Sequence, residues 1–258
     1  MTLAGKIALI TGGSKGIGLA IAHGLARQGA AVVIAARNQA DLDAALMDLR
    51  ANGARAEAVV CDVADAAQVD GLAPAVQDKL GPVDILVNNA GIAGSHKLVG
   101  HPDDLWARIL QVNLTGTYLV CKAFAPGMIE RRQGRIINIA SVASKVGARY
   151  MTAYTASKHG VLGLTRALAA ELIPYNVTVN AICPGYVDTP MTETTIANIM
   201  QLTGRSEADA RKAIEGMSPQ NRLIEPEEVA AVAVMLAQET AKGITGQAIN
   251  VDGGAVMF

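Results

Sequence analysis

Short runs of apolar residues alternate with amphipathic stretches along the whole chain. The runs are typical of buried strands, and we expect seven of them, at residues 6–10, 31–35, 56–61, 83–87, 135–139, 178–182 and 248–251. Between the runs, apolar residues recur at the spacing of one helix face, which predicts helices over residues 17–28, 41–52, 68–80, 103–133, 152–173 and 227–238. Pro126 has no N–H for the helix ladder, so we expect an irregularity there.

Continuous apolar strands that alternate with helices predict a single α/β domain. We expect a doubly wound, Rossmann-type fold over residues 1–258, with a seven-stranded parallel sheet covered by helices on both faces. No internal repeat or long linker divides the chain. Such sheets bind ligands beyond the carboxyl ends of their strands, so the strand-end loops are where functional residues are expected.

Composition narrows the class of partner. Lys and Arg number 22 against 23 Asp and Glu, a balance that argues against a nucleic-acid partner. The three cysteines and four histidines are scattered without ligand spacing, so we expect neither a disulfide framework nor a metal site. We find no secretory leader and no stretch of membrane-spanning length, and therefore expect a cytoplasmic protein with no membrane partner.

A glycine-rich loop, Thr11–Gly18, joins the first strand to the first helix. Small residues let a backbone approach a diphosphate, and a helix N-terminus offers it free N–H donors. The loop has the spacing G-x-x-x-G-x-G, which differs from the usual dinucleotide fingerprint, and a plain tight turn is the alternative. The residues assigned here to cofactor binding are Gly12, Ser14, Lys15, Gly16, Ile17 and Gly18.

The end of the second strand bears on which cofactor is bound. Ala36 stands about 20 residues after Gly16, where an NAD-binding protein usually places an acid for the ribose 2′-hydroxyl. Arg37 follows it, and with Lys15 it gives two cations and no anion, which suits the 2′-phosphate of NADP(H). We therefore favour NADP(H) over NAD(H). The alternative is that both cations merely face solvent.

Asp62 and Val63 follow the third strand, and we place both at the cofactor site. The Asp62 carboxylate could accept a hydrogen bond from an adenine amino group. The alternative is that Asp62 caps the following helix.

Tyr154 and Lys158 lie four positions apart at the start of a predicted helix, about 40° apart around its axis. An ammonium group so close should lower the pKa of the tyrosine from its usual value of about 10. The tyrosine could then exchange protons near neutral pH. Ser141 ends the fifth strand and could hold a substrate carbonyl oxygen beside it. Asn113 stands in an apolar helix and could hold a water that relays protons to Lys158.

The order of these motifs resembles the short-chain dehydrogenase/reductase family over the whole chain. Further matches are Asn88–Gly91, Pro184–Gly185 and Val251–Gly254. The resemblance implies that Tyr154 is the general acid/base, that Lys158 lowers its pKa and holds the nicotinamide ribose, that Ser141 orients the carbonyl and that Asn113 anchors the proton relay. It also implies cofactor contacts from Asn89, Val187 and Thr189. A protein of this fold that binds nucleotide without catalysis should lack the Tyr/Lys pair, which this chain keeps.

Residues 190–222 are the part least like the family, and we expect two short helices there that form a substrate lid. Apolar residues at helical spacing (Ile196, Ile199 and Met200) favour a substrate with hydrophobic bulk, unless they only pack the lid against the sheet. Within the family the chain resembles NADP-preferring 3-oxoacyl thioester and ketone reductases. The alternative is an NAD-dependent secondary alcohol or 3-hydroxyacyl-CoA dehydrogenase that works in the oxidative direction.

Members that act on carrier-protein substrates have basic residues at the ends of both long helices. Arg131 and Arg132 match the first place, but Pro174–Asn176 offers no cation at the second. Carrier protein, CoA and free ketone all stay open.

The two long helices also carry more apolar residues than one sheet face needs, so we expect a homotetramer built on them. These residues are Leu105, Ile109, Val112, Leu119 and Phe124 on the first helix and Val161, Leu162, Leu164, Leu168 and Leu172 on the second.

Overall fold

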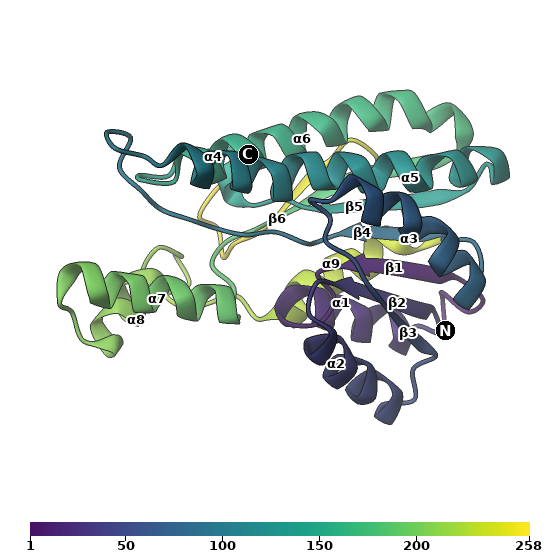
Figure 1. Ribbon diagram of the computed structural model, residues 1–258, viewed down its shortest axis with the longest axis horizontal. Coiled ribbons are helices and arrows are strands. Elements are labelled where there is room, and N and C mark those ends of the chain that lie inside the picture. The colour runs from purple at the N-terminus through teal and green to yellow at the C-terminus, as the bar shows by residue number, and fades with distance from the viewer.

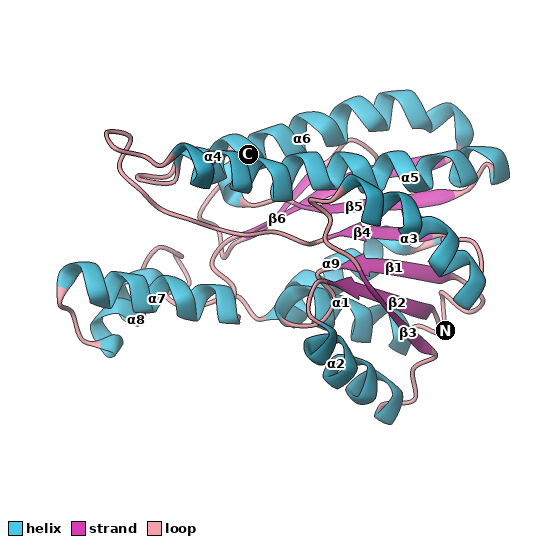
Figure 2. Ribbon diagram, viewed as in Figure 1, coloured by secondary structure: helices cyan, strands magenta, loops and turns pink.

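Seven parallel strands form one twisted sheet at the centre of the molecule. The computed structural model describes residues 1–258 and places the strands in the order β3-β2-β1-β4-β5-β6-β7. Figure 2 shows the sheet between two layers of helices. The strands are β1 (Ile7–Thr11), β2 (Ala31–Ala36), β3 (Ala56–Val60), β4 (Ile85–Asn88), β5 (Gly134–Ile139), β6 (Val177–Pro184) and β7 (Ala248–Val251).

The helices divide between the two faces of the sheet. One apolar core joins the sheet to α1 (Gly16–Arg27), α2 (Gln39–Ala51) and α9 (Pro226–Ala237). A second core joins the other face to α3 (Ala66–Lys79), α5 (Gly116–Arg131) and α6 (Thr152–Leu172). Residues of the five central strands are almost wholly buried, as expected where helices cover both faces, whereas the edge strands β3 and β7 are mostly half-buried. No helix combines the length and the apolar character needed to cross a membrane.

The predicted doubly wound fold is confirmed, and every predicted strand and helix ends within two residues of its observed boundary. Side-chain caps account for two of the differences. Asn38 accepts a hydrogen bond from the Asp41 N–H, so α2 begins at Gln39. Asp65 accepts from the N–H groups of Ala67 and Gln68, so α3 begins at Ala66. Such caps satisfy N–H groups that a helix leaves free at its first turn.

The irregularity in the long fourth helix is not at Pro126, where we expected it. The chain is helical from α4 (Asp103–Leu110) through α5, and Pro126 lies inside regular α5. The departure from α geometry is a π turn at Gln111–Thr115, whose middle residue is Asn113. Single π turns within α-helices are frequent at functional sites.

Two further helices, α7 (Pro190–Thr203) and α8 (Glu207–Glu215), form an arm between β6 and α9. In Figure 1 the arm, in green, projects from the body beside the sheet. Ser206 caps α8, since its hydroxyl accepts from the Asp209 N–H. The apolar face of α7 packs within the arm, where Ile196 joins Ala210 and Ile214 of α8. This packing against α8 accounts for Ile196, while Ile199 and Met200 are only partly buried, so a substrate with hydrophobic bulk stays a prediction.

Candidate active site

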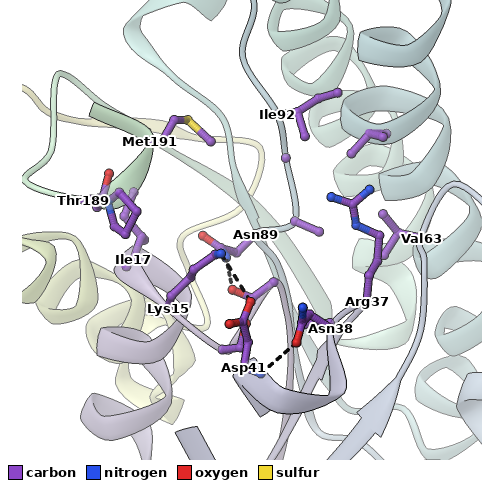
Figure 3. Close-up of a pocket in the computed structure, with 18 of the residues that line it drawn as sticks. Lys15, Ile17, Arg37, Asn38, Asp41, Val63, Asn89, Ile92, Thr189 and Met191 are labelled. Atoms are coloured by element: carbon purple, nitrogen blue, oxygen red, sulfur yellow. Dashed lines mark hydrogen bonds and ion pairs between the residues drawn. The ribbon is translucent and has the colours of Figure 1, made fainter. Parts of the chain in front are cut away.

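A groove of about 250 Å³ opens at the carboxyl ends of β1, β2, β3 and β4 (Figure 3). The order of the sheet places β1 and β4 side by side, and the helices that follow them lie on opposite faces. Loops that leave in opposite directions open a crevice at this point. Ten residues that we assigned to cofactor binding line it: Gly12, Ser14, Lys15, Gly16, Ile17, Arg37, Asp62, Val63, Asn89 and Thr189.

The glycine-rich loop at the base of the groove has the shape needed to receive a diphosphate. Gly12 has a φ of +63°, and a Cβ there would lie 2.9 Å from the Ala90 Cα, so a side chain is excluded. A Cβ on Gly18 would collide with the Gly12 carbonyl oxygen. No side chain caps the first turn of α1, so its N–H groups are free to bind an anion. The loop therefore fits the diphosphate of a dinucleotide.

Asn89 holds this loop against the end of β4. Its Nδ2 donates to the carbonyl oxygens of Thr11 at 3.1 Å and Gly12 at 3.0 Å. The Thr11 hydroxyl accepts in turn from the N–H groups of Asn89 and Ala90. The contact we assigned to Asn89, with the cofactor ribose, stays a prediction; the structure shows that the side chain also shapes the groove.

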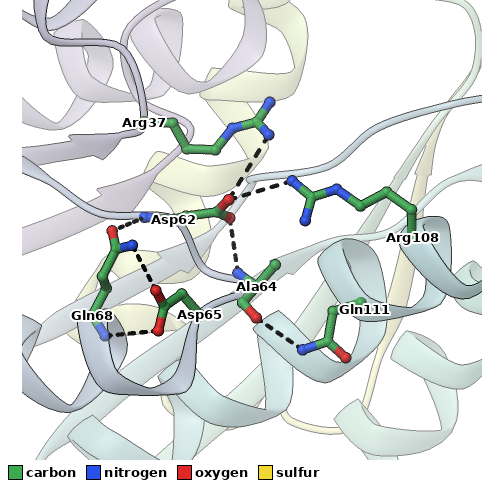
Figure 4. Close-up of polar contacts among 7 residues, drawn as sticks. All are labelled: Arg37, Asp62, Ala64, Asp65, Gln68, Arg108 and Gln111. Carbon is green, nitrogen blue, oxygen red and sulfur yellow. Dashed lines mark hydrogen bonds and ion pairs between the residues drawn. The ribbon is translucent and has the colours of Figure 1, made fainter.

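Two carboxylates line the groove beside the predicted phosphate-binding cations. Lys15 Nζ lies 3.3 Å from Asp41 Oδ2, and Arg37 Nη1 lies 3.9 Å from Asp62 Oδ2 (Figures 3 and 4). Our expectation of two cations and no anion was wrong, because the first turn of α2 brings Asp41 next to the glycine-rich loop. All four side chains line the same groove.

Asp62 is held by a polar network that Figure 4 shows. Its Oδ1 accepts from the Ala64 N–H, and its Oδ2 lies 3.3 Å from Arg108 Nη2 as well as near Arg37. Asp62 thus forms an Asx turn. It does not cap the following helix, the alternative considered above, because Asp65 caps α3. Arg108, from α4, had no sequence signal that linked it to this site.

The catalytic candidates meet at the ends of β5 and β6. Lys158 is buried, and its Nζ donates to the Ile139 carbonyl oxygen at 2.8 Å and lies 5.7 Å from the centre of the Tyr154 ring. The Ser141 side chain lies close enough to the Tyr154 hydroxyl to lower its pKa. A Cβ on Gly91 would lie 3.7 Å from Lys158 Nζ, and Gly91 lines the groove. Lys158 therefore stands next to the groove, with Tyr154 and Ser141 close to it, although none of the three lines the groove itself.

Ser141 is held by a turn that the sequence did not reveal. Its N–H donates to Ser144 Oγ at 3.1 Å, and Ser144 Oγ donates to the Ser141 carbonyl oxygen at 2.5 Å. The Ser141 hydroxyl accepts from the Ala143 N–H at 3.1 Å, which leaves its proton free to be donated. Ser144 thus holds the backbone of Ser141, and the Ala143 N–H orients the Ser141 hydroxyl.

The pKa of Tyr154 moves in the direction opposite to our prediction. Burial raises it above the ordinary value, and the Ser141 side chain offsets only part of that rise. Burial also lowers the pKa of Lys158 to about 8, so this side chain is only partly charged above neutral pH. Tyr154 is consequently a phenol, ready to donate a proton, in the ligand-free protein.

The depressed pKa of Lys158 predicts a pH dependence of stability. Between pH 8 and 10.5 the unfolded chain binds this proton while the native chain has released it, so the free energy of unfolding rises with pH. This gain in stability is complete above pH 10.5, the pKa of the lysine in the unfolded chain. It is lost as the pH falls to about 8, the pKa of Lys158 in the native chain. We expect the wild type to gain roughly 2 kcal/mol relative to Lys158→Met between about pH 8 and 10, in urea unfolding of the ligand-free protein. Parallel pH profiles of the two proteins would contradict this.

Both amide hydrogens of Asn113 are used by protein groups. Its Oδ1 accepts from the Ile92 N–H at 2.8 Å, and its Nδ2 donates to the Ile92 carbonyl oxygen and to Ser157 Oγ. The π turn therefore aims the side chain at the loop after β4 and at α6. The water relay stays a prediction, and the amide itself has no donor left for it.

The remaining assigned residues lie where the arm begins. The Val187 carbonyl oxygen accepts from the hydroxyls of Thr189 and Thr192, and Thr189 stands just before α7. Met191, in the first turn of α7, is exposed and lines the groove, a position that no sequence motif indicated. The cofactor contacts of Val187 and Thr189 are not tested by these positions.

Fold and site together define a dinucleotide-dependent oxidoreductase. The family described as short chain dehydrogenase matches residues 6–199, and the chain belongs to that family. The resemblance inferred from the motifs is confirmed.

Individual relatives narrow the comparison further. The chain is 43% identical over 255 residues to a protein of Streptomyces violaceoruber named as ketoacyl reductase 1 of the granaticin polyketide synthase, covering 98% of this chain and 94% of that one. It is 38% identical to the 3-oxoacyl-[acyl-carrier-protein] reductase of Vibrio harveyi over the full length of both. A crystal structure of a variant of actinorhodin polyketide ketoreductase with NADPH superposes with a TM-score of 0.95 at 40% identity, covering 98% of each chain.

Proposed function

We propose that the protein reduces a ketone to a secondary alcohol with NADPH, and that the ketone is a 3-oxoacyl thioester or a hydrophobic ketone. One observation carries the proposal: Tyr154, Ser141 and Lys158 lie together next to a groove that Lys15 and Arg37 line. The relatives named as ketoacyl and 3-oxoacyl-[acyl-carrier-protein] reductases support it, as does the NADPH in the structural neighbour.

The site residues have distinct tasks in this reaction. A nicotinamide dinucleotide bound in the groove supplies the hydride. Tyr154 donates its proton to the carbonyl oxygen, and the Ser141 hydroxyl donates a hydrogen bond to the same atom. The raised pKa of Tyr154 keeps the phenol protonated, the form that reduction needs. Lys158 would hold the nicotinamide ribose, and Asn113 keeps the loop after β4 in place through its bonds with Ile92.

A substrate panel tests the proposal. The purified protein is given NADPH or NADH with a 3-oxoacyl-CoA, a 3-oxoacyl carrier protein or a bulky free ketone, and loss of reduced cofactor is followed by absorbance. We expect consumption of NADPH with at least one thioester or ketone. Faster turnover of a secondary alcohol or 3-hydroxyacyl-CoA with NAD would favour the alternative, an oxidative NAD-dependent dehydrogenase.

The same panel decides the acyl carrier. Arg131 Nη2 donates to the Val83 carbonyl oxygen and Arg132 Nη2 to that of Pro174, so both guanidinium groups serve the chain's own packing. These bonds remove part of the support for carrier-protein docking at this place.

We propose that the arm over residues 190–222 acts as a lid, with Met191 at its groove side.

We further propose that the protein is a homotetramer built on α4, α5 and α6. Six of the ten apolar residues that suggested it are buried within the chain itself: Ile109, Val112, Phe124, Val161, Leu162 and Leu172. Leu105, Leu119, Leu164 and Leu168 are partly exposed, and Trp106 and Tyr118 on the same helices are exposed. Light scattering at micromolar concentration should give a mass near four times 26.6 kDa, and a mass near 26.6 kDa would refute the tetramer.

We place the protein in the cytoplasm, with a small molecule as its substrate. Cys61, Cys121 and Cys183 are free and buried, which suits a reducing compartment.

A further inference from the structure

Asp41 is the acid that lies closest to a predicted phosphate-binding cation. Lys15 Nζ and Asp41 Oδ2 are 3.3 Å apart, and both side chains line the groove (Figure 3). The Asp41 side chain is 43% exposed, so it faces both the lysine and the space of the groove.

The position of Asp41 is fixed by the start of α2. Its N–H donates to Asn38 Oδ1 at 2.9 Å, the bond that caps the helix. A ligand can turn the carboxylate about its side-chain bonds, but it cannot move the residue away without breaking that cap. The negative charge therefore remains at this end of the groove when a ligand binds.

The second acid nearby differs in its surroundings. Asp62 Oδ2 lies near two guanidinium groups, those of Arg37 and Arg108, which offset its charge. Asp41 has Lys15 as its one cationic partner. A phosphate that takes Lys15 leaves the Asp41 carboxylate unpaired beside it.

We infer that Asp41 sets how strongly the enzyme prefers NADP(H) over NAD(H), an inference that rests on the NADP(H) dependence proposed above. The 2′-phosphate of NADP(H) must take Lys15 from Asp41 and meet the repulsion of the carboxylate. A 2′-hydroxyl meets no such repulsion and can donate a hydrogen bond to a carboxylate. Asp41 thus weakens the preference that Lys15 and Arg37 create.

Nicotinamide-free nucleotides test this by calorimetry on the full, ligand-free chain. The probes are 2′,5′-ADP, which carries the 2′-phosphate, and 5′-ADP, which lacks it. Asp41→Asn is expected to tighten 2′,5′-ADP by about threefold to tenfold at low salt and to leave 5′-ADP unchanged or weaker. The gain should shrink as salt is added, because exposed charges are screened.

Asp43→Asn is the matched control. Asp43 lies in the same turn of α2 and is exposed, but it accepts from Gln39 and does not line the groove. We expect it to leave both affinities near those of the wild type. Equal gains in the two variants, or no gain or a loss in Asp41→Asn, would overturn the inference.

The wild type separates this inference from the proposed cofactor. Tighter binding of 2′,5′-ADP than of 5′-ADP by the unmodified protein supports NADP(H), and the reverse order refutes that cofactor. The comparison of Asp41→Asn with Asp43→Asn is read independently, as a change in affinity for each probe.

Discussion

Replacement of Tyr154 by phenylalanine is expected to lower the rate of ketone reduction by about 10²- to 10⁴-fold while NADPH still binds. The substitution removes the phenolic proton and leaves the ring, which stands beside Lys158 and Ser141. Those neighbours keep their own bonds to Ile139 and Ala143, so the site should hold its shape. The rate is measured with saturating NADPH, and binding is measured separately by NADPH fluorescence.

Tyr175→Phe provides the control for this prediction. Tyr175 lies beyond the opposite end of α6 and is partly exposed, so loss of its hydroxyl should leave the rate unchanged. Retention of most of the rate in Tyr154→Phe would remove the tyrosine from the mechanism. Equal loss in both variants would point to a general effect on the fold.

Replacement of Arg37 by aspartate is expected to lower the ratio of kcat/KM with NADPH to kcat/KM with NADH by about 100-fold. The arginine is held loosely, since 3.9 Å from Asp62 is too long for a hydrogen bond, and its side chain is free to turn onto a phosphate. Aspartate there would add a third acid beside Asp41 and Asp62 and repel the 2′-phosphate. The loss should fall on KM for NADPH more than on kcat.

The same change of charge at Arg55 separates a local effect from a general one. Arg55 is exposed and directly precedes β3, at the amino end of the strand, whereas the groove lies at the carboxyl ends. Arg55→Asp should leave the cofactor ratio near the wild-type value. A wild-type enzyme that uses NADH as well as NADPH would contradict the cofactor prediction before any variant is made.

The order of strands and helices could be predicted because each segment carries its own signal. Strands buried on both faces are continuously apolar, and β1 and β2 show this in almost every residue. The glycine-rich loop and the Tyr154/Lys158 pair could be found for the same reason, since their spacing is local. Ser141 was found from its place at a strand end, and Asn89 from the resemblance to the family.

Features that depend on contacts between distant segments could not be predicted. Asp41 reaches Lys15 only because α2 starts beside the first loop, and Arg108 reaches Asp62 across 46 positions of chain. The pKa of Tyr154 depends on burial, which helical spacing alone does not show, so its direction was wrong. The π turn has no distinct sequence pattern, and the proline that suggested an irregularity fits within a regular helix.

The arm of α7 and α8 has an apolar core of its own, made of Ile196, Ala210, Ile214 and Leu223 and separate from the two cores of the sheet. The family match ends at residue 199, inside α7. Substitutions within this core therefore cost the sheet little, whereas those under α1 or α5 would disturb it directly. If the arm is the substrate lid proposed above, exchange of the arm alone would change the substrate while the groove and the tyrosine stay as they are.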